Sequence, residues 1–262
     1  MLNIYSLFNI WVNDFDLSTL LKIITESIES DKKTIIGNHN LHSLYLNQSN
    51  KLLQKFNSKC DYIHIDGMSM VFIANLLGIP VHRPNRITYV DLIDPLIQLI
   101  HKRDYKVFYL GSKPGVAKKA FHKINQEIGQ VRSDYHHGYF DISPNSKENI
   151  SVLEQIKLFS PDILLVGMGM PRQESWIIEN FNKIQAKVIM NSGACFDYVS
   201  GEVRTPPRWM GRLGLEWVFR LKEDPNRLWS RYIIEPIQLF PLFVKEFYKK
   251  RIKSFFLKAD NY

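Results

Sequence analysis

Several apolar runs in the sequence end in residues that could activate or bind a substrate, and Asp66 is the most reactive of these by type. It follows the run "YIHI" and precedes Gly67, which lets the chain turn tightly into the next segment. A carboxylate at such a turn could be a general base that takes a proton from a hydroxyl. Aspartate at a strand-to-helix turn more often caps the helix, so the position alone leaves both roles open.

Amides and glycines follow the other apolar runs. Asn38 and Asn40 lie at the end of the run "TIIGNHN", where their side-chain amides could form hydrogen bonds with hydroxyl groups. Gly111 begins "GSKPGVAKKA", whose backbone N–H groups and helix dipole could receive a phosphate, although a plain turn explains it equally well. Gly167 begins "GMGMPRQ", which repeats this arrangement. Within it, Gln173 could fix a sugar hydroxyl or a base edge, or could simply be solvated.

The histidines do not form a convincing metal site. Those of "GNHNLHS" and "YHHGYF" lack clustered carboxylates and further histidines at a fitting spacing, so we expect no bound metal. We interpret "DYHHGYF" as a polar loop beside a stacking tyrosine, Tyr139. The "DFD" at 14–16 matches the D-x-D pattern of metal-dependent sugar-nucleotide enzymes, but its position favours capping of the helix "LSTLLKIITESI".

Residues 204–262 carry most of the net positive charge, +7 of the +8 of the whole chain. They hold 13 of the 34 Lys and Arg residues but only 6 of the 26 Asp and Glu residues. Glu216 and Arg220 are spaced i,i+4 in one expected helix, and Arg227 and Arg231 in the next, where two arginines on one face favour a shared anion. Packing of arginine stems on the neighbouring tryptophans is the structural alternative.

The end of this segment has the pattern of an interfacial membrane helix, in which an apolar stripe adjoins a cluster of basic residues. The stripe consists of Phe240, Val244, Phe247, Arg251 and Phe255, and the basic cluster of Lys249, Lys250, Arg251 and Lys253. An amphipathic helix docked on the protein is the alternative. The charge by itself indicates an anionic partner, whether nucleic acid, acidic lipid or a diphosphate.

The elements that position these residues are predicted by alternation along the chain. The apolar runs "TIIGNHN", "YIHID", "KVFYLG", "DILLVGMG" and "KVIMNSG" alternate with helical periodicities, which predicts an α/β, Rossmann-like doubly wound sheet. Ligands of such sheets lie beyond the carboxyl ends of the strands, so the segment 191–197, with Asp197, joins the candidates. We assign residues 1–203 to the α/β core and 204–262 to a basic helical appendage.

Within the appendage, "RWMGRLGLEWVFRLK" has a helical pattern, and Asp224 followed by Pro225 suits the start of another helix. Pro236 and Pro241 are expected to interrupt the helical pattern that follows them. No segment approaches about 20 uninterrupted apolar residues, and the N-terminus lacks a secretory signal, so we expect a cytoplasmic protein. A homo-oligomer is among the states that the sequence allows.

Seven segments taken in order resemble the WecG/TagA/CpsF glycosyltransferases, known as glycosyltransferase family 26, over roughly residues 3–235. They are "IDGMSMVFIANLLG", "NRITYVDLIDPL", "VFYLGSKPGVA", "YHHGYF", "PDILLVGMGMPRQESWI", "NSGACFDYVSGEVRTPPRWM" and "GLEWVFRLKEDPNRLWSRY". The resemblance implies a core of the arrangement called GT-E. It also implies an inverting, metal-independent transfer from a UDP-sugar to a polyprenyl-diphosphate-linked acceptor sugar, at the inner face of the cell membrane, in the assembly of a cell-surface polysaccharide or a teichoic-acid-type glycan.

The resemblance also implies roles for single residues. Asp66 matches the proposed catalytic base, Asn40 a substrate-contacting asparagine and Arg86 the arginine of an E-R-x-T-G-x-D segment. Arg220 and Arg227 match arginines of an appendage thought to close over the active site at the membrane. We expect substrate contacts from nine residues: Asn38, Gly111, Tyr139, Gly167, Gln173, Asp197, Arg220, Arg227 and Arg231.

Several positions depart from the family's pattern. Asn38, Ser69, Asn85 and Tyr89 replace residues common in relatives, and all four lie near the expected sugar pocket, so the donor sugar is not transferred. Ser230 stands where relatives often carry another arginine.

Two rival functions remain at this stage. A nicotinamide-dependent oxidoreductase fits the sheet class, but the glycine fingerprint is incomplete. A membrane adaptor or nucleic-acid-binding protein without catalysis would use the basic tail but leaves the polar strand ends unexplained. We therefore expect a transferase with no nucleic-acid partner, an anionic membrane surface as a partner, and no cofactor beyond its UDP-sugar substrate.

Overall fold

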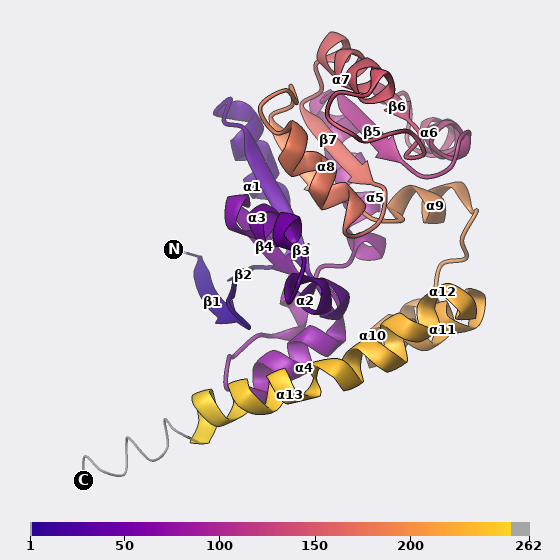
Figure 1. Cartoon of the computed structure of the whole chain (residues 1–262). Coiled ribbons are helices and arrows are strands. Elements are labelled where there is room, and N and C mark those ends of the chain that lie inside the picture. The colour runs from indigo at the N-terminus through magenta and orange to yellow at the C-terminus, as the bar shows by residue number, and fades with distance from the viewer. Residues whose placement is uncertain (1, 253–262) are drawn as a thin grey trace.

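The core is a six-stranded parallel sheet with helices on both faces (Figure 1). The computed structural model describes residues 2–252, except for the side chains of residues 208, 212 and 252. The strands lie in the order β4-β3-β8-β7-β5-β6. They are β3 (Thr34–His39), β4 (Tyr62–Ile65), β5 (Val107–Gly111), β6 (Ser133–His136), β7 (Ile163–Gly167) and β8 (Val188–Asn191). This arrangement confirms the predicted Rossmann-like doubly wound fold.

Five of the six strands were predicted, and β6 was missed. Strands β3, β5, β7 and β8 are buried along their whole length, so their sequences are nearly continuous apolar runs. Strand β6 pairs only with β5, as the edge of the sheet, and its four residues "SDYH" are half-buried. The prediction of a polar loop for "DYHHGYF" was therefore wrong for residues 134–136, because an edge strand does not need an apolar sequence.

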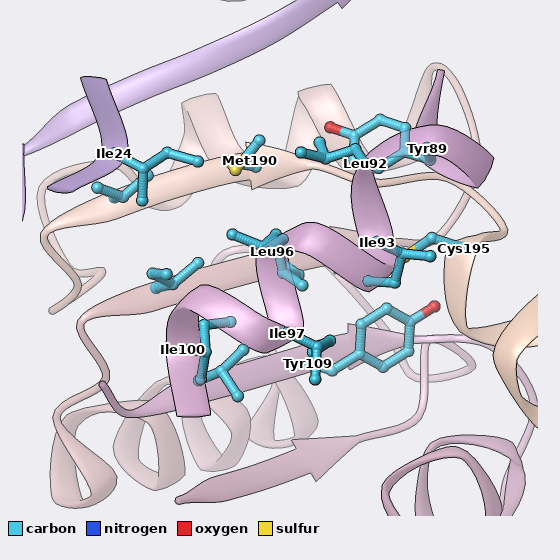
Figure 2. Close-up of a cluster of buried hydrophobic side chains, with 14 of the residues drawn as sticks. Ile24, Tyr89, Leu92, Ile93, Leu96, Ile97, Ile100, Tyr109, Met190 and Cys195 are labelled. Atoms are coloured by element: carbon cyan, nitrogen blue, oxygen red, sulfur yellow. The ribbon is translucent and has the colours of Figure 1, made fainter. Parts of the chain in front are cut away.

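Helices cover the two faces of the sheet with separate apolar clusters. One face packs against α1 (Leu17–Glu29), α5 (Tyr89–Arg103), α6 (Val116–Glu127) and α9 (Cys195–Ser200). Figure 2 shows this cluster, in which Leu92, Ile93 and Leu96 of α5 lie among Tyr109, Met190 and Ile24. The other face packs against α3 (Lys51–Lys59), α7 (Lys147–Phe159) and α8 (Arg172–Asn180).

A third cluster lies beyond strand β4, where the N-terminal hairpin packs. The hairpin pairs β1 (Asn3–Leu7) antiparallel with β2 (Ile10–Asp14), and it was not predicted. The Asn13 side chain accepts a hydrogen bond of 2.9 Å from the Ile63 amide of β4. The predicted role of "DFD" is confirmed, because Asp16 caps α1 by accepting from the Thr19 amide at 2.8 Å. Helices α2 (Leu41–Asn47) and α4 (Met68–Leu76) complete this side.

After α9 the chain leaves the sheet and forms the appendage (gold in Figure 1). Its elements are α10 (Arg208–Leu213), α11 (Glu216–Glu223), α12 (Pro225–Trp229), the π-helical turn η2 (Ser230–Ile234), α13 (Glu235–Phe247) and a second π-helical turn η3 (Tyr248–Ile252). Asp224 caps α12 and Pro225 occupies its first turn, as predicted. Gly214, with φ of +74°, separates α10 from α11.

The two prolines do not interrupt the appendage as expected. Pro236 lies in the first turn of α13, where its missing N–H costs little, and the exposed Pro241 lies inside the helix. Helix α13 docks on the third cluster through one face, formed by Leu239, Leu242, Phe243 and Phe247.

The other face of α13 exposes Ile237, Phe240 and Val244, each more than 45% accessible. The predicted stripe is thus partly wrong. Phe247 packs inward, and the Arg251 Nε donates to the carbonyl of Leu76 at 3.1 Å. Lys253 and Phe255 lie outside the described residues.

Candidate active site

The carboxyl ends of the parallel strands open on a cavity of about 1170 Å³, roofed by the appendage. Nearly all residues that were expected to contact substrate lie in its wall. From the core these are Asn38, Asn40, Asp66, Tyr139, Gly167, Gln173 and Asp197, and from the appendage Arg220, Arg227 and Arg231. The fold therefore brings together side chains from both predicted parts of the chain.

Asp66 follows strand β4 and does not cap the next helix. The N-cap of α4 is Gly67, at φ of +95°, and no side chain bonds to the first turn. The capping interpretation of Asp66 was therefore wrong. Instead, its Oδ2 accepts a hydrogen bond of 3.0 Å from the Nδ2 of Asn40. The carboxylate lines the cavity and is available to a ligand.

Asn40 is fixed by the start of α2, which explains how it can hold Asp66. Its Oδ1 accepts from the Ser43 amide at 2.9 Å, while the Ser43 hydroxyl accepts from the Asn40 amide at 2.9 Å. This reciprocal capping box fixes the side-chain amide with its Nδ2 directed at Asp66. Asn40 thus caps helix α2 through its Oδ1 and donates a hydrogen bond to Asp66 through its Nδ2.

Beneath the cavity lies a buried polar network, centred on Glu174. Its Oε1 accepts from the Nε2 of Gln173 and the Nδ2 of Asn191, each at 2.7 Å. The same Asn191 Nδ2 lies 3.2 Å from the Oδ1 of Asn38. Burial raises the pKa of Glu174, whose Oε2 has no hydrogen-bond partner among the described residues. Sequence reasoning missed Glu174, because a glutamate in the first turn of a helix usually faces solvent.

Gln173 is more constrained than expected of a ligand-binding amide. It is 1% exposed, and its Oε1 accepts from the amides of Gly169 at 3.1 Å and Gly193 at 3.3 Å. The side chain thereby joins the loops that follow β7 and β8. Only part of its Nε2 hydrogen-bonding capacity remains for a substrate, because this atom also donates to Glu174.

Residues of the loop after β5 and of α9 form another wall. The Ser112 hydroxyl donates to the Oδ2 of Asp197 at 2.9 Å, and burial raises the pKa of Asp197. The N-cap of helix α6 is Gly115, which has no side chain to cap the helix, so the first-turn N–H groups have no acceptor from the N-cap side chain. Gly111 does not line the cavity: it lies inside the sheet, where a Cβ atom would collide with the backbone of Gly167.

Three arginines of the appendage face the cavity in different ways. Arg227 is exposed and held by the carboxylate of Asp224, with Nε 2.5 Å from Oδ2. Arg220 is half-buried, with its guanidinium over the ring of Tyr198 at 5.4 Å from the centroid, and its buried Nε has no partner among the described residues. Burial lowers the pKa of Arg220, but the neighbouring Tyr198 and other nearby groups, including Asp66, raise it overall. Arg231 lies in η2, where burial lowers its pKa.

A smaller cavity of about 320 Å³ meets the first one at Asp66. Asn40, Asp66, Arg220, Arg231 and Tyr232 line both cavities. The remaining wall of the smaller cavity includes apolar side chains from α2, α4 and α11, namely Leu41, Met68, Phe72 and Trp217. The carboxylate of Asp66 therefore stands between a large, polar compartment and a small one with an apolar wall.

Arg86 borders the smaller cavity and links the core to the appendage. Its guanidinium lies 2.7 Å from the Oδ2 of Asp91 and 3.2 Å from the Oε1 of Glu216 on α11. Glu216 was expected to pair with Arg220 along one helix, but it pairs with Arg86 instead.

The histidines near the site have separate partners. His39 is buried and its Nδ1 lies 2.7 Å from the Ser43 hydroxyl, while the Nδ1 of His42 lies 2.7 Å from the Oε2 of Glu235. Across residues 2–252, no three His, Cys, Asp or Glu side chains are grouped so as to hold one metal ion.

Comparison with known proteins gives a consistent match over nearly the whole chain. Residues 5–253 match the model of the glycosyl transferase WecG/TagA/CpsF family. Proteins of Staphylococcus aureus strains MRSA252, MW2 and NCTC 8325 are each 29% identical over 250 residues, which cover 92% of this chain and 91% of each relative. All three are named N-acetylglucosaminyldiphosphoundecaprenol N-acetyl-beta-D-mannosaminyltransferase.

Proposed function

Because the chain belongs to the WecG/TagA/CpsF family of glycosyltransferases, we propose that it transfers a sugar from a UDP-sugar to a polyprenyl-diphosphate-linked acceptor sugar. The family makes the protein a glycosyltransferase rather than an oxidoreductase or a non-catalytic adaptor. The names of the relatives support a lipid-diphosphate acceptor in the assembly of a cell-wall glycan. The observation that carries the proposal is the position of Asp66, between two cavities that several arginines border.

The larger cavity suits the donor. Its volume of about 1170 Å³ lies above the roughly 300–1,000 Å³ of common small-molecule pockets, so the cavity is large enough for a nucleotide-sugar. The donor's diphosphate would lie near Arg220, Arg227 and Arg231, which line this cavity. Asp197 and the buried Asn38 offer oxygen atoms that could accept from sugar hydroxyls.

The smaller cavity suits the acceptor. Its apolar wall, with Phe72 and Trp217, would contact the first part of a lipid chain, while Arg231 faces the diphosphate that joins lipid to sugar. A donor on one side of Asp66 and an acceptor on the other would place the attacking hydroxyl next to this carboxylate. Such an approach from the face opposite the leaving group inverts the anomeric centre.

The chemistry then follows from the positions of the groups. Asp66 takes the proton of the acceptor hydroxyl as its oxygen forms a bond to the anomeric carbon, and Asn40 holds the carboxylate in place. The bond between the anomeric carbon and the diphosphate breaks, and UDP departs with the electron pair. Charge develops on the departing diphosphate, where the arginines stabilise it. We propose that these cations make a metal ion unnecessary.

The surface around the smaller cavity favours association with a membrane. Ile237, Phe240 and Val244 of α13 are exposed, as are Phe72 and Leu76 of α4. In Figure 1, α4, α10 and α13 gather along the same side of the molecule, and Lys245 and Lys249 lie on the α13–η3 segment. Apolar side chains with adjacent lysines bind the surface of an anionic bilayer.

None of the helices within residues 2–252 is long and apolar enough to cross a bilayer. We propose a peripheral enzyme at the inner face of the cell membrane, where a lipid-linked acceptor is accessible.

The decisive experiment replaces Asp66 and measures acceptor-dependent release of UDP. With a panel of UDP-sugars and a short-chain lipid-diphosphate acceptor, mass spectrometry identifies the donor and the product. We expect Asp66→Asn to lower kcat by about 10²- to 10⁴-fold, the usual contribution of a general base. Asp94→Asn, the same change at an exposed position of α5, is the control and should leave kcat unchanged. Wild-type turnover by Asp66→Asn would exclude Asp66 as the base.

A further inference from the structure

Two polar contacts tie the appendage to the core beside Asp66. One is the pair of Arg86 with Glu216 on α11. The other joins residues 193 positions apart: the Nδ1 of His42, in the first turn of α2, lies 2.7 Å from the Oε2 of Glu235, the first residue of α13. The side chains of His42 and Glu235 are only 16% and 8% exposed.

The chain on either side of this contact leads directly to the candidate active site. On the core side, His42 lies two residues after Asn40, whose amide holds Asp66. On the appendage side, Glu235 directly follows the π-helical turn that carries Arg231 and Tyr232, both of which line the two cavities. π-Helical turns are rare, and they frequently occur at functional sites.

The burial of the pair determines where its proton lies. Burial lowers the pKa of His42 to about 4 and raises the pKa of Glu235 to about 7. The charge of Arg231 acts on both groups, lowering the pKa of each. Between these values the imidazole is neutral and the Glu235 carboxyl donates a hydrogen bond to Nδ1. A neutral pair avoids most of the desolvation cost of a buried ion pair.

We propose that His42 and Glu235 are positioning residues that dock the turn 230–234 on α2 and so hold Arg231 beside Asp66. His42 also borders the smaller cavity, whereas Glu235 lines neither cavity, and the pair acts through Arg231 on one side and through α2 on the other. The expected effect on turnover rests on the proposed function. The docking itself does not, and it can be measured without any substrate.

Conservative and disruptive variants separate positioning from general stability. Glu235→Gln keeps a donor for Nδ1, whereas Glu235→Ala and His42→Ala remove the contact. At pH 7 we expect the two alanine variants to speed amide exchange of residues 225–234 by about tenfold or more, with the core strands β5 and β7 unchanged. The double alanine variant should be no worse than either single one, because both remove the same contact. Gln238→Ala, at an exposed position of α13, is the matched control.

The pH dependence gives a signature that a merely structural role would not produce. In the undocked state, Glu235 and His42 take their ordinary pKa values of 4.5 and 6.5. The raised pKa of Glu235 favours docking at low pH and loses this effect as the pH rises to 7. The lowered pKa of His42 favours docking above 6.5 and loses this effect as the pH falls to 4. Between 4.5 and 6.5 the pair holds one proton whether docked or not, so the wild-type protein should change little.

Each single glutamine variant removes one of these opposing effects. Glu235→Gln should lose protection of residues 225–234 as the pH falls from 6.5 towards 4. His42→Gln should lose it as the pH rises from 4.5 to 7. Turnover at pH 7 should change in parallel with docking. Glu235→Gln should be close to wild type, and Glu235→Ala should be lower by about tenfold.

Three outcomes would overturn the proposal: unchanged exchange in the alanine variants, equal loss of exchange protection in β5 and β7, or glutamine variants with the same pH profile. Failure of the proposed function alone would leave the exchange pattern intact and abolish only its link to turnover.

Discussion

Replacement of Glu174 tests whether the network beneath the cavity is held by this single carboxyl group. Glu174→Ala removes the acceptor of two buried amide donors, on Gln173 and Asn191. Each buried donor left without a partner costs about 1–3 kcal/mol, so the two donors together predict a loss of about 2–6 kcal/mol in the free energy of unfolding. Glu174→Gln retains an acceptor oxygen and should lose less than half as much. Glu179→Ala, at an exposed position of the same helix, should change stability by no more than about 0.5 kcal/mol.

The pH dependence of the Glu174 variants adds a second criterion. Burial raises the pKa of Glu174 above its ordinary value of 4.5, so the folded protein retains this proton more strongly than the unfolded chain. The associated stability is fully present below 4.5 and is lost as the pH rises through the folded-state pKa. Wild type should therefore lose stability relative to Glu174→Gln as the pH rises from 5 to 8, because other titrating groups are common to both.

Urea unfolding followed by tryptophan fluorescence measures both quantities. A loss below about 1 kcal/mol in Glu174→Ala, or a difference between wild type and Glu174→Gln that does not fall with pH, would refute the reasoning.

Two further predictions concern the membrane surface and the arginines. Phe240→Glu with Val244→Glu should abolish sedimentation with anionic vesicles and leave the fold intact, because both side chains are exposed; Leu158→Glu, at an exposed position of α7, should sediment as wild type does, and unchanged binding of the double variant would exclude this face. Arg231→Gln should lower kcat by about 10²-fold, whereas Arg227→Gln, at an exposed position, should mainly raise the KM for the donor. Equal effects of the two variants on kcat would contradict these different roles of the two arginines.

The fold could be predicted from the sequence where burial determines composition. Strands β3, β5, β7 and β8 lie between two layers of helices, and their sequences are largely apolar, with polar residues such as Asn38 and Asn191 near their carboxyl ends. The hairpin β1–β2 and the edge strand β6 are partly exposed, so their sequences carry a weaker signal. The helical pattern "LHSLYLNQSNKLLQKF" after β3 forms two helices, α2 and α3, and Asn50 caps the second by accepting from the Leu53 amide.

The candidate site was predictable in its residue types but not in its hydrogen bonding. The rule that ligands lie beyond strand ends selected Asp66 and Asn40, which the structure places in contact. The choice between a capping and a free carboxylate depended on the conformation of Gly67, which a sequence does not reveal. The roles of Glu174 and Glu235 depend on partners that are distant in sequence or hidden beneath the cavity wall, and no local pattern indicates such contacts.

Helix α13 shows why membrane-binding and docked-helix interpretations could not be separated by periodicity. Leu239, Phe243 and Phe247 form one apolar row that packs on the core, and Phe240 and Val244 belong to a second row that is exposed. Both rows have helical spacing, so the sequence supports both interpretations. The docked-helix interpretation fits the row that packs on the core, and the membrane-binding interpretation fits the exposed row. A deletion of the helix would remove both faces together and expose the core, whereas substitutions in the exposed row change the surface alone.

Because Glu235 begins this same helix and lies against His42, a helix held at the bilayer would also hold Arg231 beside Asp66. We therefore expect membrane binding and closure of the candidate site to be linked through α13.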